Sequence, residues 1–297
     1  MIMPKLSVII AAFNDISLLE QCLTSLKGQW EMPDTEVFVA ANYRDGLQQM
    51  FERQFPDVKY LCCSAQTTVP ELRTQGILHT TGEILALTED HCIFDEHWCS
   101  EIKKAHESSC PVIGGSVENA SKRLLDWAVY FHDYGKYMLP NQAGGVETLS
   151  GINVSYKRLF LNKIKDTFQK GFFETFIHLK LTREGEQLYL MPSAIVYHNK
   201  NYRMKEAFTQ SYHHGRSFAG MRTSNASFFK RLGFMLGSII LPVLLPLRIT
   251  LEIIKKGRHA KELLLSFPYL VLLMTSWSYG EFCGYLFGEG GSAARWR

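Results

Sequence analysis

Four consecutive residues, Thr88-Glu89-Asp90-His91, carry the strongest chemical signal in the sequence. They place two carboxylates and an imidazole directly after the apolar run Ile84 to Thr88, which has the length and composition of a buried strand. Because these polar groups are costly to bury together, we expect them to face a cleft. Oxygen and nitrogen ligands at such a turn suit a divalent cation that offsets the charge of a diphosphate. The alternative is a solvated turn that caps the next helix.

The strand before this turn is the last of a series in which short apolar runs alternate with helical stretches. This alternation predicts an α/β fold with a doubly wound, mostly parallel sheet and right-handed crossovers. In such sheets ligands bind outside the carboxyl ends of the strands. The predicted strands are Leu6 to Ala11, Glu36 to Ala41, Val58 to Cys63 and Ile84 to Thr88. The residues of interest therefore follow these strands, at Ala12 to Asp15, Asn42 to Asp45 and Glu89 to His91.

The helices between these strands also carry local signals. Ser17 and Glu20 have the spacing of a capping box, and Pro70 suits the first turn of a later helix. The first helix should bury one apolar face, formed by Leu19, Cys22, Leu23 and Leu26.

The second half of the chain is less regular. We expect a strand at Val112 to Glu118, a helix around Leu124 to Tyr137 and another helix from Glu174 to Arg183. Two short strands, 187–191 and 194–198, should close the domain at His198.

Four segments together resemble the family 2 glycosyltransferases with the GT-A fold, over residues 5 to 198. The opening LSVIIAAFND is similar to that family's first strand and nucleotide-binding turn. The stretch VPELRTQGILHTTGEILALTEDH resembles its segment from the donor-site arginine helix to the metal-binding DXD strand. LSGINVSYKR resembles its acceptor-side motif, and FFETFIHLKLTREGEQLYLMPSAIVYH its catalytic-base helix with the strand that follows. The resemblance implies a Rossmann-like GT-A domain over residues 1–200, with a nucleotide-sugar half (1–118) and an acceptor-side half (119–200).

The resemblance also assigns donor and metal residues. The residues that would bind the nucleotide sugar are Ala11, Phe13, Asn14, Asn42, Arg73, Glu89 and Asp90. A histidine, His91, stands where the family has the final aspartate, so His91, Glu89 and His198 would hold a manganese or magnesium ion. The second strand ends in Ala40-Ala41-Asn42 where the family usually has Asp-Asp-Gly, and one carboxylate contact to the nucleoside is therefore absent.

Glu174 aligns with the family's catalytic aspartate. It follows Gly171, Phe172 and Phe173, and aromatic, partly desolvated surroundings would raise its pKa towards that of a general base. An exposed first-turn glutamate favoured by the helix dipole is the alternative. For His198 the alternative is a surface histidine at the end of a strand.

Gly151 and Asn153 fall in the segment that resembles the acceptor-side motif, and they would border the acceptor pocket. The same Gly-Ile-Asn sequence is equally suited to a plain turn.

The last hundred residues differ from the rest in charge and hydropathy. Residues 1–198 carry 18 Lys and Arg against 24 Asp and Glu, whereas 199–297 carry 14 against 5. Two segments in this tail are free of charge, 232–247 and 263–280. A basic region interleaved with long apolar runs suggests an anionic membrane surface as partner, and not nucleic acid. We therefore expect 201–297 to be a helical membrane-association region.

The distribution of basic residues bears on how the tail meets the membrane. The stretch between the two apolar segments contains Arg248, Lys255, Lys256, Arg258 and Lys261. A two-span hairpin would export these charges against the positive-inside rule, so helices lying in the cytoplasmic leaflet are favoured over a hairpin. Two buried helices of a soluble dimer are the third alternative, and a homo-oligomer stays open. The seven cysteines lack regular spacing and no signal peptide precedes the first strand, so we expect the cytoplasmic face of the plasma membrane.

These observations predict an inverting, metal-dependent transfer of a sugar from a nucleotide diphosphate sugar, uridine-linked, to a hydroxyl of a lipid-linked or membrane-proximal glycan. A nucleotidyltransferase of similar fold would normally show a Gly-rich, basic first loop, which Ala11-Ala12-Phe13-Asn14 lacks. A non-catalytic membrane scaffold that retains the fold is the other alternative.

Overall fold

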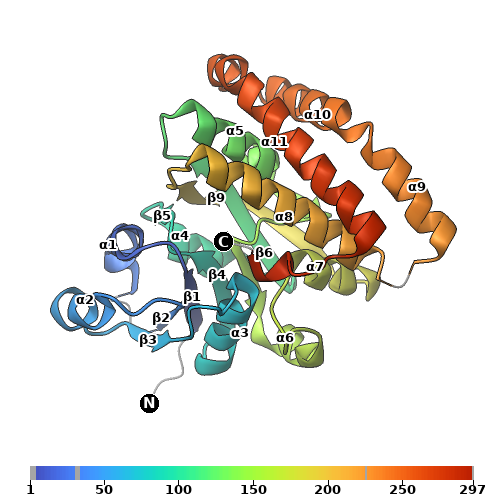
Figure 1. Cartoon of the computed structure of the whole chain (residues 1–297). Helices are drawn as coiled ribbons and strands as arrows, with labels where there is room; N and C mark the ends of the chain where they lie inside the picture. The colour runs from blue at the N-terminus through green and yellow to red at the C-terminus, as the bar shows by residue number, and fades with distance from the viewer. Residues whose placement is uncertain (1–4, 31–33, 225, 296–297) are drawn as a thin grey trace. The chain divides into compact units, whose positions relative to one another are not determined.

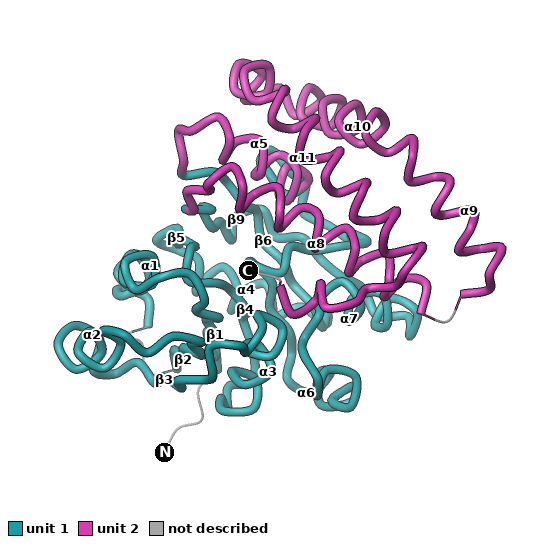
Figure 2. Tube along the Cα trace, viewed as in Figure 1, with its two compact units in different colours: residues 1–120, 137–199 teal, residues 121–136, 200–297 magenta. Residues whose placement is uncertain are grey.

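The computed structural model describes residues 5–30, 34–224 and 226–295, and its elements are labelled in Figure 1. The chain forms two compact units (Figure 2). Unit 1 comprises residues 1–120 and 137–199, and unit 2 comprises 121–136 and 200–297. Residues 121–136, which the sequence analysis placed in the acceptor-side half, thus group with the C-terminal helices.

Unit 1 is built around one mixed sheet of nine strands in the order β3-β2-β1-β4-β8-β6-β9-β5, with β7 also paired to β9. The strands are β1 (Leu6–Ala12), β2 (Thr35–Ala41), β3 (Lys59–Cys62), β4 (Ile84–Glu89), β5 (Cys92–Phe94), β6 (Val112–Asn119), β7 (Gly144–Val146), β8 (Val154–Lys157) and β9 (Leu188–His198). The helices of this unit are α1 (Ile16–Trp30), α2 (Leu47–Gln54), α3 (Val69–His79), α4 (Trp98–Ala105), α6 (Arg158–Lys163) and α7 (Glu174–Arg183).

The first four strands in the chain, β1 to β4, pair in parallel and confirm the doubly wound pattern. β1 pairs in parallel with β2 and with β4, and Ala11 lies opposite Ala40 on one side and Glu89 on the other. Every residue of β1 and β4 is buried, as expected for strands covered on both faces. The strand order reverses at β1, so the carboxyl ends of β1 and β4 form the switch point at which such sheets bind ligands.

The second half of the sheet departs from the prediction in one element. The two short strands expected at 187–191 and 194–198 are one continuous strand, β9, which pairs in parallel with β6. The register shifts between Gly115 and Ser116, so that Gly115 lies opposite Met191 and Ser116 opposite Ile195. The shift leaves residues 192–194 unpaired with β6, so Pro192, which has no N–H to donate, interrupts no hydrogen bond of the ladder.

Two helix starts show how capping positions the chain. α1 buries Leu19, Cys22, Leu23 and Leu26 as predicted, but the Ser17/Glu20 capping box is wrong. The carboxylate of Asp15 accepts a hydrogen bond from the N–H of Leu18 at 3.0 Å instead, so the helix begins at Ile16. α3 has a capping box between Thr68 and Glu71, and Pro70 stands in its first turn as predicted.

Unit 2 is entirely helical in the residues that the structure describes, apart from its connections. It contains α5 (Leu124–Asp133), α8 (Met204–Arg222), α9 (Phe228–Ser238), α10 (Leu241–Lys256) and α11 (Ala260–Phe287). α8 and α11 lie side by side along much of their length (Figure 1). Glycines permit this approach, because a Cβ at Gly280 or Gly284 would overlap the carbonyl oxygen of Tyr212 or Arg216.

The basic stretch 248–262, expected to connect the two apolar segments, is mostly helix. Arg248, Lys255 and Lys256 belong to α10, which ends where Gly257 adopts a left-handed conformation with φ of 67°. The break falls earlier, between α9 and α10, whose axes are bent by 68°. Pro242 stands in the first turn of α10, where its missing N–H costs no hydrogen bond. Within the described residues α11 alone has the length and hydropathy to cross a membrane, and the bent pair α9–α10 also passes if counted as one segment.

Candidate functional site

Asp90 anchors the turn that follows β1. Its Oδ2 atom accepts hydrogen bonds from the backbone N–H groups of Phe13 and Asn14, both at 2.9 Å, and its Oδ1 accepts one from the Asn14 amide at 2.6 Å. The N–H of Asp90 in turn donates to the carbonyl of Ala11. These bonds join the carboxyl ends of β1 and β4, so four of the predicted donor-site residues are brought together.

Arg73 connects two carboxylates from different parts of unit 1. Its Nη1 lies 2.5 Å from Oε2 of Glu174, and its Nη2 lies 2.6 Å from Oε1 of Glu89. Nη2 also donates to the carbonyl of Gly151 at 3.3 Å. The arginine side chain is only 5% exposed, against 10% for Glu89 and 18% for Glu174. The first turn of α7 is thereby tied to the end of β4.

The expectation that Glu89, Asp90 and His91 face an open cleft is wrong for this structure. Their exposed fractions are 7%, 0% and 3%. Burial is possible because each carboxylate has a partner, Arg73 for Glu89 and the backbone N–H groups of the turn for Asp90. The alternative of a solvated turn is excluded by the same burial.

His91 and His198 meet at the end of the sheet. Their ring centroids are 4.8 Å apart and nearly perpendicular, and the ring of Phe13 lies 6.1 Å from that of His91. His198 is fully buried at the end of β9, where it pairs with Cys92 of β5. The alternative of a surface histidine is therefore excluded for His198.

The surroundings of His91 fit a metal ligand. Its Nε2 is buried and has no hydrogen-bond partner among the described residues. If Nε2 coordinated a cation, the proton would sit on Nδ1, so the side-chain nitrogen of Asn14, 3.3 Å away, could not donate to it, and its acceptor neighbours would be Glu89 Oε2 at 3.6 Å and Asp90 Oδ1 at 3.8 Å. Carboxylates behind a ligating imidazole commonly orient it in this way. Across residues 5–30, 34–224 and 226–295, however, no three His, Cys, Asp or Glu side chains are gathered around one point as a complete metal site.

The pKa of Glu174 is lowered, and the expectation that its surroundings raise it is wrong. Burial acts to raise the pKa, but the charge of Arg73 and the hydrogen bonds to the carboxylate outweigh it. Glu174 is therefore ionised at neutral pH and held in place by Arg73. It is not an exposed first-turn glutamate, since its carboxylate lies against Arg73 and Gly151.

Gly151 and Asn153 occupy different environments. A Cβ at Gly151 would lie 2.6 Å from Cδ of Glu174, so only glycine fits against the carboxylate there. Asn153 is fully buried, and its amide nitrogen donates to the carbonyls of Ser116 and Ala194, both at 2.8 Å. Its amide oxygen accepts from Trp98 Nε1 at 2.9 Å. Asn153 thus stabilises the irregular pairing of β6 and β9, whereas Gly151 borders the Arg73–Glu174 pair.

The sequence matches the family described as Glycosyl transferase family 2 over residues 7–165. The chain belongs to this family. The match covers β1 to β8 and includes Asp90, His91 and Arg73, the residues that the preceding geometry brings together. A comparison with curated protein sequences finds no significant match.

Solved structures of similar fold agree with a family 2 glycosyltransferase of GT-A type. One is the mannosyltransferase PcManGT from Pyrobaculum calidifontis in complex with GDP-Man and Mn²⁺, with a TM-score of 0.58 and 14% identity. The likeness covers 96% of this chain and 88% of that one. Another is GalNAc-T7 with UDP, GalNAc and Mn²⁺, with a TM-score of 0.52 and 11% identity over 66% of this chain and 43% of that one. At these identities the likeness concerns the fold alone.

Two residues of this family 2 domain were given no role of their own by sequence reasoning, although one of them, Tyr43, lies in the range Asn42 to Asp45 named as of interest. Tyr43 follows β2 beside Asn42, and its buried hydroxyl has no hydrogen-bond partner among the described residues. Burial raises the pKa of Tyr43, as do the charges of Asp90 and Asp15. Asn42 itself donates to the carbonyl of Thr67 at 2.9 Å. An isolated tyrosine after a strand carries no motif, so only its position at the carboxyl end of β2 could have indicated it.

The second missed residue is His178, one turn after Glu174 on α7. Its Nε2 lies 2.8 Å from the hydroxyl of Tyr156, and the histidine is 1% exposed. Burial lowers its pKa to about 4, although the charge of Glu174 opposes this shift. His178 is therefore neutral at pH 7 and pairs with Tyr156. The helical spacing of four residues was the available signal.

Proposed function

We propose that this glycosyltransferase moves a sugar from a nucleotide diphosphate sugar, uridine-linked, to a hydroxyl of a lipid-linked or membrane-proximal glycan, with inversion at the anomeric carbon. The observation that carries the proposal is the Arg73 bridge between Glu89 and Glu174 at the carboxyl ends of β1 and β4. A cationic group for the donor and an ionised carboxylate for the acceptor lie next to each other at the position where parallel sheets bind nucleotides.

The reaction needs one proton acceptor. The acceptor hydroxyl transfers its proton to the carboxylate of Glu174 while its oxygen bonds to the anomeric carbon. The bond from that carbon to the diphosphate oxygen breaks on the opposite face, and the nucleoside diphosphate leaves with the electron pair. Attack from the face opposite the leaving group inverts the configuration. Gly151 borders the carboxylate of Glu174, which packs against the glycine where a Cβ would otherwise lie.

The donor would lie over the turn after β1. Ala11, Phe13, Asn14 and Asn42 would line the nucleotide, while Arg73 supplies positive charge to the diphosphate. Asp90 acts indirectly in this arrangement, because its carboxylate is used to hold the N–H groups of Phe13 and Asn14.

A divalent cation, manganese or magnesium, is part of the proposal. The Mn²⁺ in the structures of PcManGT and GalNAc-T7 supports it, as does the unpartnered Nε2 of His91. His91 would hold the ion with help from Glu89 and His198, and the remaining ligands would be diphosphate oxygens and water. When bound, the ion offsets negative charge on the leaving diphosphate.

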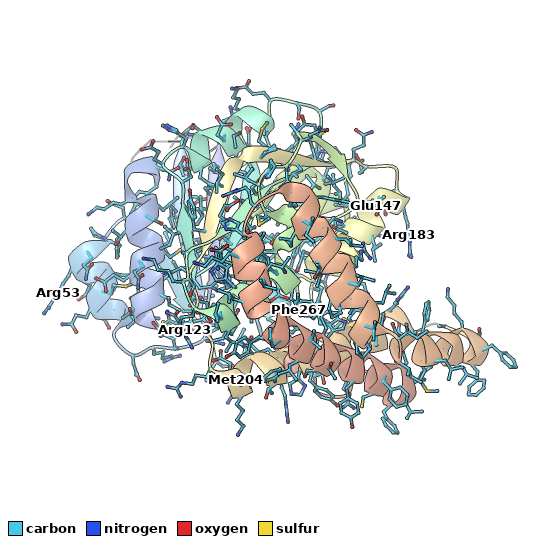
Figure 3. The ribbon with its side chains drawn as sticks, turned by 90° about the horizontal axis from the view of Figure 1, so that it is seen from above. Arg53, Arg123, Glu147, Arg183, Met204 and Phe267 are labelled. Atoms are coloured by element: carbon cyan, nitrogen blue, oxygen red, sulfur yellow. The ribbon has the colours of Figure 1, made fainter. Side chains whose placement is uncertain are left out.

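We place residues 201–297 at the membrane. Large apolar side chains are exposed on α9, on α10 and on the two residues between them: Phe228, Phe229, Leu236, Ile239, Ile240, Val243, Leu244, Leu247, Leu251 and Ile254. Carbon-rich side chains project outward along this part of unit 2 (Figure 3). Lys230, Arg231, Lys255 and Lys256 lie among them in the chain, a combination that suits the surface of an anionic bilayer.

The packing of α11 supports helices that lie in the cytoplasmic leaflet over a two-span hairpin. α11 contacts α8 directly through glycine, and Ser211 of α8 donates to the carbonyl of Leu273 at 2.8 Å. α8 carries Lys205, Arg216 and Arg222, which hydrocarbon would not accommodate. If α11 crossed the bilayer, α8 would enter it as well. The attachment we propose is therefore peripheral or monotopic.

The test is a screen of sugar nucleotides with and without MnCl₂, using membranes or detergent-solubilised full-length protein. Donor binding is detected by thermal stabilisation, and transfer is detected by release of nucleoside diphosphate. NMR of the product then gives the anomeric configuration. Retention of configuration would contradict a single displacement with Glu174 as base. Formation of nucleoside triphosphate and sugar 1-phosphate when pyrophosphate is added to the sugar nucleotide would indicate a nucleotidyltransferase instead.

A further inference from the structure

Arg73 divides its two terminal nitrogens between carboxylates that the proposed function gives to opposite sides of the reaction. Glu89 ends β4 beside the donor turn, and Glu174 begins α7 on the acceptor side. The two contacts measure 2.6 and 2.5 Å, short enough for charge-assisted hydrogen bonds. An arginine commonly uses both terminal nitrogens on one carboxylate. Here each nitrogen binds a different carboxylate, so Arg73 links β4 to α7.

The Nε–H of this guanidinium has no hydrogen-bond partner among the described residues. This nitrogen is buried, in keeping with a side chain that is only 5% exposed, so water does not replace the missing acceptor. A buried donor without an acceptor is unfavourable, and on a cationic group it favours an anionic oxygen. The same guanidinium is therefore able to bind a phosphate oxygen, but only at the expense of its hold on the carboxylates, because their contacts already use both terminal nitrogens.

We propose that Arg73 is a positioning residue that couples donor binding to the base: it clamps Glu174 before the donor arrives and shifts towards the diphosphate when the donor binds. This inference rests on the proposed function. The coupling predicts the direction of a change in nucleoside diphosphate affinity, because Glu174 and the diphosphate compete for the same guanidinium. Removal of the Glu174 charge should tighten nucleoside diphosphate binding, and it should do so only while Arg73 is present.

The experiment is a double-mutant cycle on the full-length protein in detergent. Dissociation constants for UDP with MnCl₂ are measured by calorimetry for wild type, Glu174→Gln, Arg73→Lys and the double variant. Lysine keeps the charge but cannot bridge two carboxylates. We expect Glu174→Gln to tighten UDP binding about threefold or more in the wild-type background and to change it less than about 1.5-fold in the Arg73→Lys background, as for directly coupled residues. Arg73→Gln replaces Arg73→Lys if the lysine variant does not fold.

Glu184→Gln is the matched control. Glu184 caps the same helix, α7, and pairs with Lys180 at 3.1 Å on the surface, so its charge should leave UDP binding unchanged. Uridine serves as the second control ligand, because it lacks phosphates and should bind equally to wild type and Glu174→Gln.

The outcomes separate the coupling from the proposed function. Equal tightening in both Arg73 backgrounds would mean that Glu174 repels the diphosphate directly, and the coupling would be wrong. Unchanged or weaker binding in Glu174→Gln would also overturn it. If wild-type protein binds neither UDP nor GDP with Mn²⁺, the donor site itself is refuted and the coupling with it.

Discussion

The side-chain amide of Asn14 donates a 2.6 Å hydrogen bond to Oδ1 of Asp90, across 76 residues of sequence. Together with the two N–H bonds to Oδ2, it fastens the turn after β1 to the end of β4. Asp90 therefore shapes the proposed donor site by holding the backbone of the turn after β1.

Asp90→Ala should be destabilising. The substitution leaves the N–H groups of Phe13 and Asn14 partly buried without an acceptor, at a cost of roughly 1–3 kcal/mol for each unsatisfied group. We expect the free energy of unfolding to fall by about 2–4 kcal/mol, measured by urea denaturation with detergent present. Asp166→Ala, in the exposed turn before α7, is the control and should change stability by less than about 0.5 kcal/mol. Equal effects of both variants would contradict the anchoring role.

Glu174→Gln should abolish most of the turnover. Glutamine keeps the size of the side chain but cannot accept the proton, so kcat should fall at least about a hundredfold. Nucleoside diphosphate binding should not be lost, because Arg73 stays available to the donor. The measurement is steady-state transfer with calorimetric binding in parallel. If more than about a tenth of wild-type turnover remains, Glu174 is not the base, and Asp166 or Glu147 becomes the next candidate.

The pH dependence follows from the lowered pKa of Glu174. The carboxylate is the active form, so it is fully present above the folded-state pKa and is lost as the pH falls through that value. Because Arg73 holds the pKa below the ordinary value of 4.5, the acidic limb of kcat/KM should lie below pH 4.5. The contribution of the Arg73–Glu174 pair to stability follows the same direction. It is fully present above the pKa of Glu174 in the unfolded chain and is lost as the pH falls through the folded-state pKa. An acidic limb near pH 6 or 7 would contradict this assignment.

Loss of the metal should act on the phosphates. Chelation should abolish transfer, and His91→Ala should weaken binding of UDP with Mn²⁺ more than binding of uridine. The unpartnered Nε2 of His91 is the physical basis. Equal losses for both ligands would indicate general misfolding, and full activity in chelator would remove the metal from the mechanism. His97→Ala, at an exposed position outside the site, is the control.

Membrane attachment should depend on α9 and α10. Val243→Asp with Leu247→Asp places two charges on the exposed apolar face and should reduce flotation with anionic vesicles, as should deletion of residues after Ser227. Leu159→Asp is a matched control, since Leu159 is 68% exposed in unit 1 and its change should leave flotation intact. If full-length protein is soluble without detergent and does not bind anionic vesicles, membrane attachment through 201–297 is wrong. Cysteine labelling of 248–262 from outside the cell would separate the hairpin from helices in the leaflet.

Much of the fold could be predicted from local pattern. The first four strands and α7 were located within a residue or two, because continuous β-branched runs and helical periodicity are strong signals. The continuous β9 was missed because Pro192 suggests a break, and the irregularity that tolerates it depends on Asn153, far away in sequence. The first part of 248–262 was treated only as a connection between two apolar segments because of its charges, but 248–256 is the last part of α10, and Leu, Glu and Lys in LEIIKK are good helix formers.

The site was predicted less completely than the fold. The residues at the ends of β1 and β4 do meet, since parallel strands fix that edge. What the sequence could not show is how the charges pair: Arg73 neutralises Glu89 and Glu174 together, so the carboxylates are buried and the pKa of Glu174 is lowered. Such pairing depends on side-chain positions from three separate segments, and no local pattern encodes it.

The glycine contacts between α8 and α11 have a consequence for how this tail can evolve. At Gly215, Gly280 and Gly284 the main chain of one helix touches that of the other, so the spacing of the two axes is set by backbone atoms and not by adjustable side chains. Even alanine would force the helices apart. The exposed apolar residues of α9 and α10 face no such restriction and can be exchanged for one another. Genetic drift should therefore alter the exposed apolar surface quickly while these three positions stay glycine.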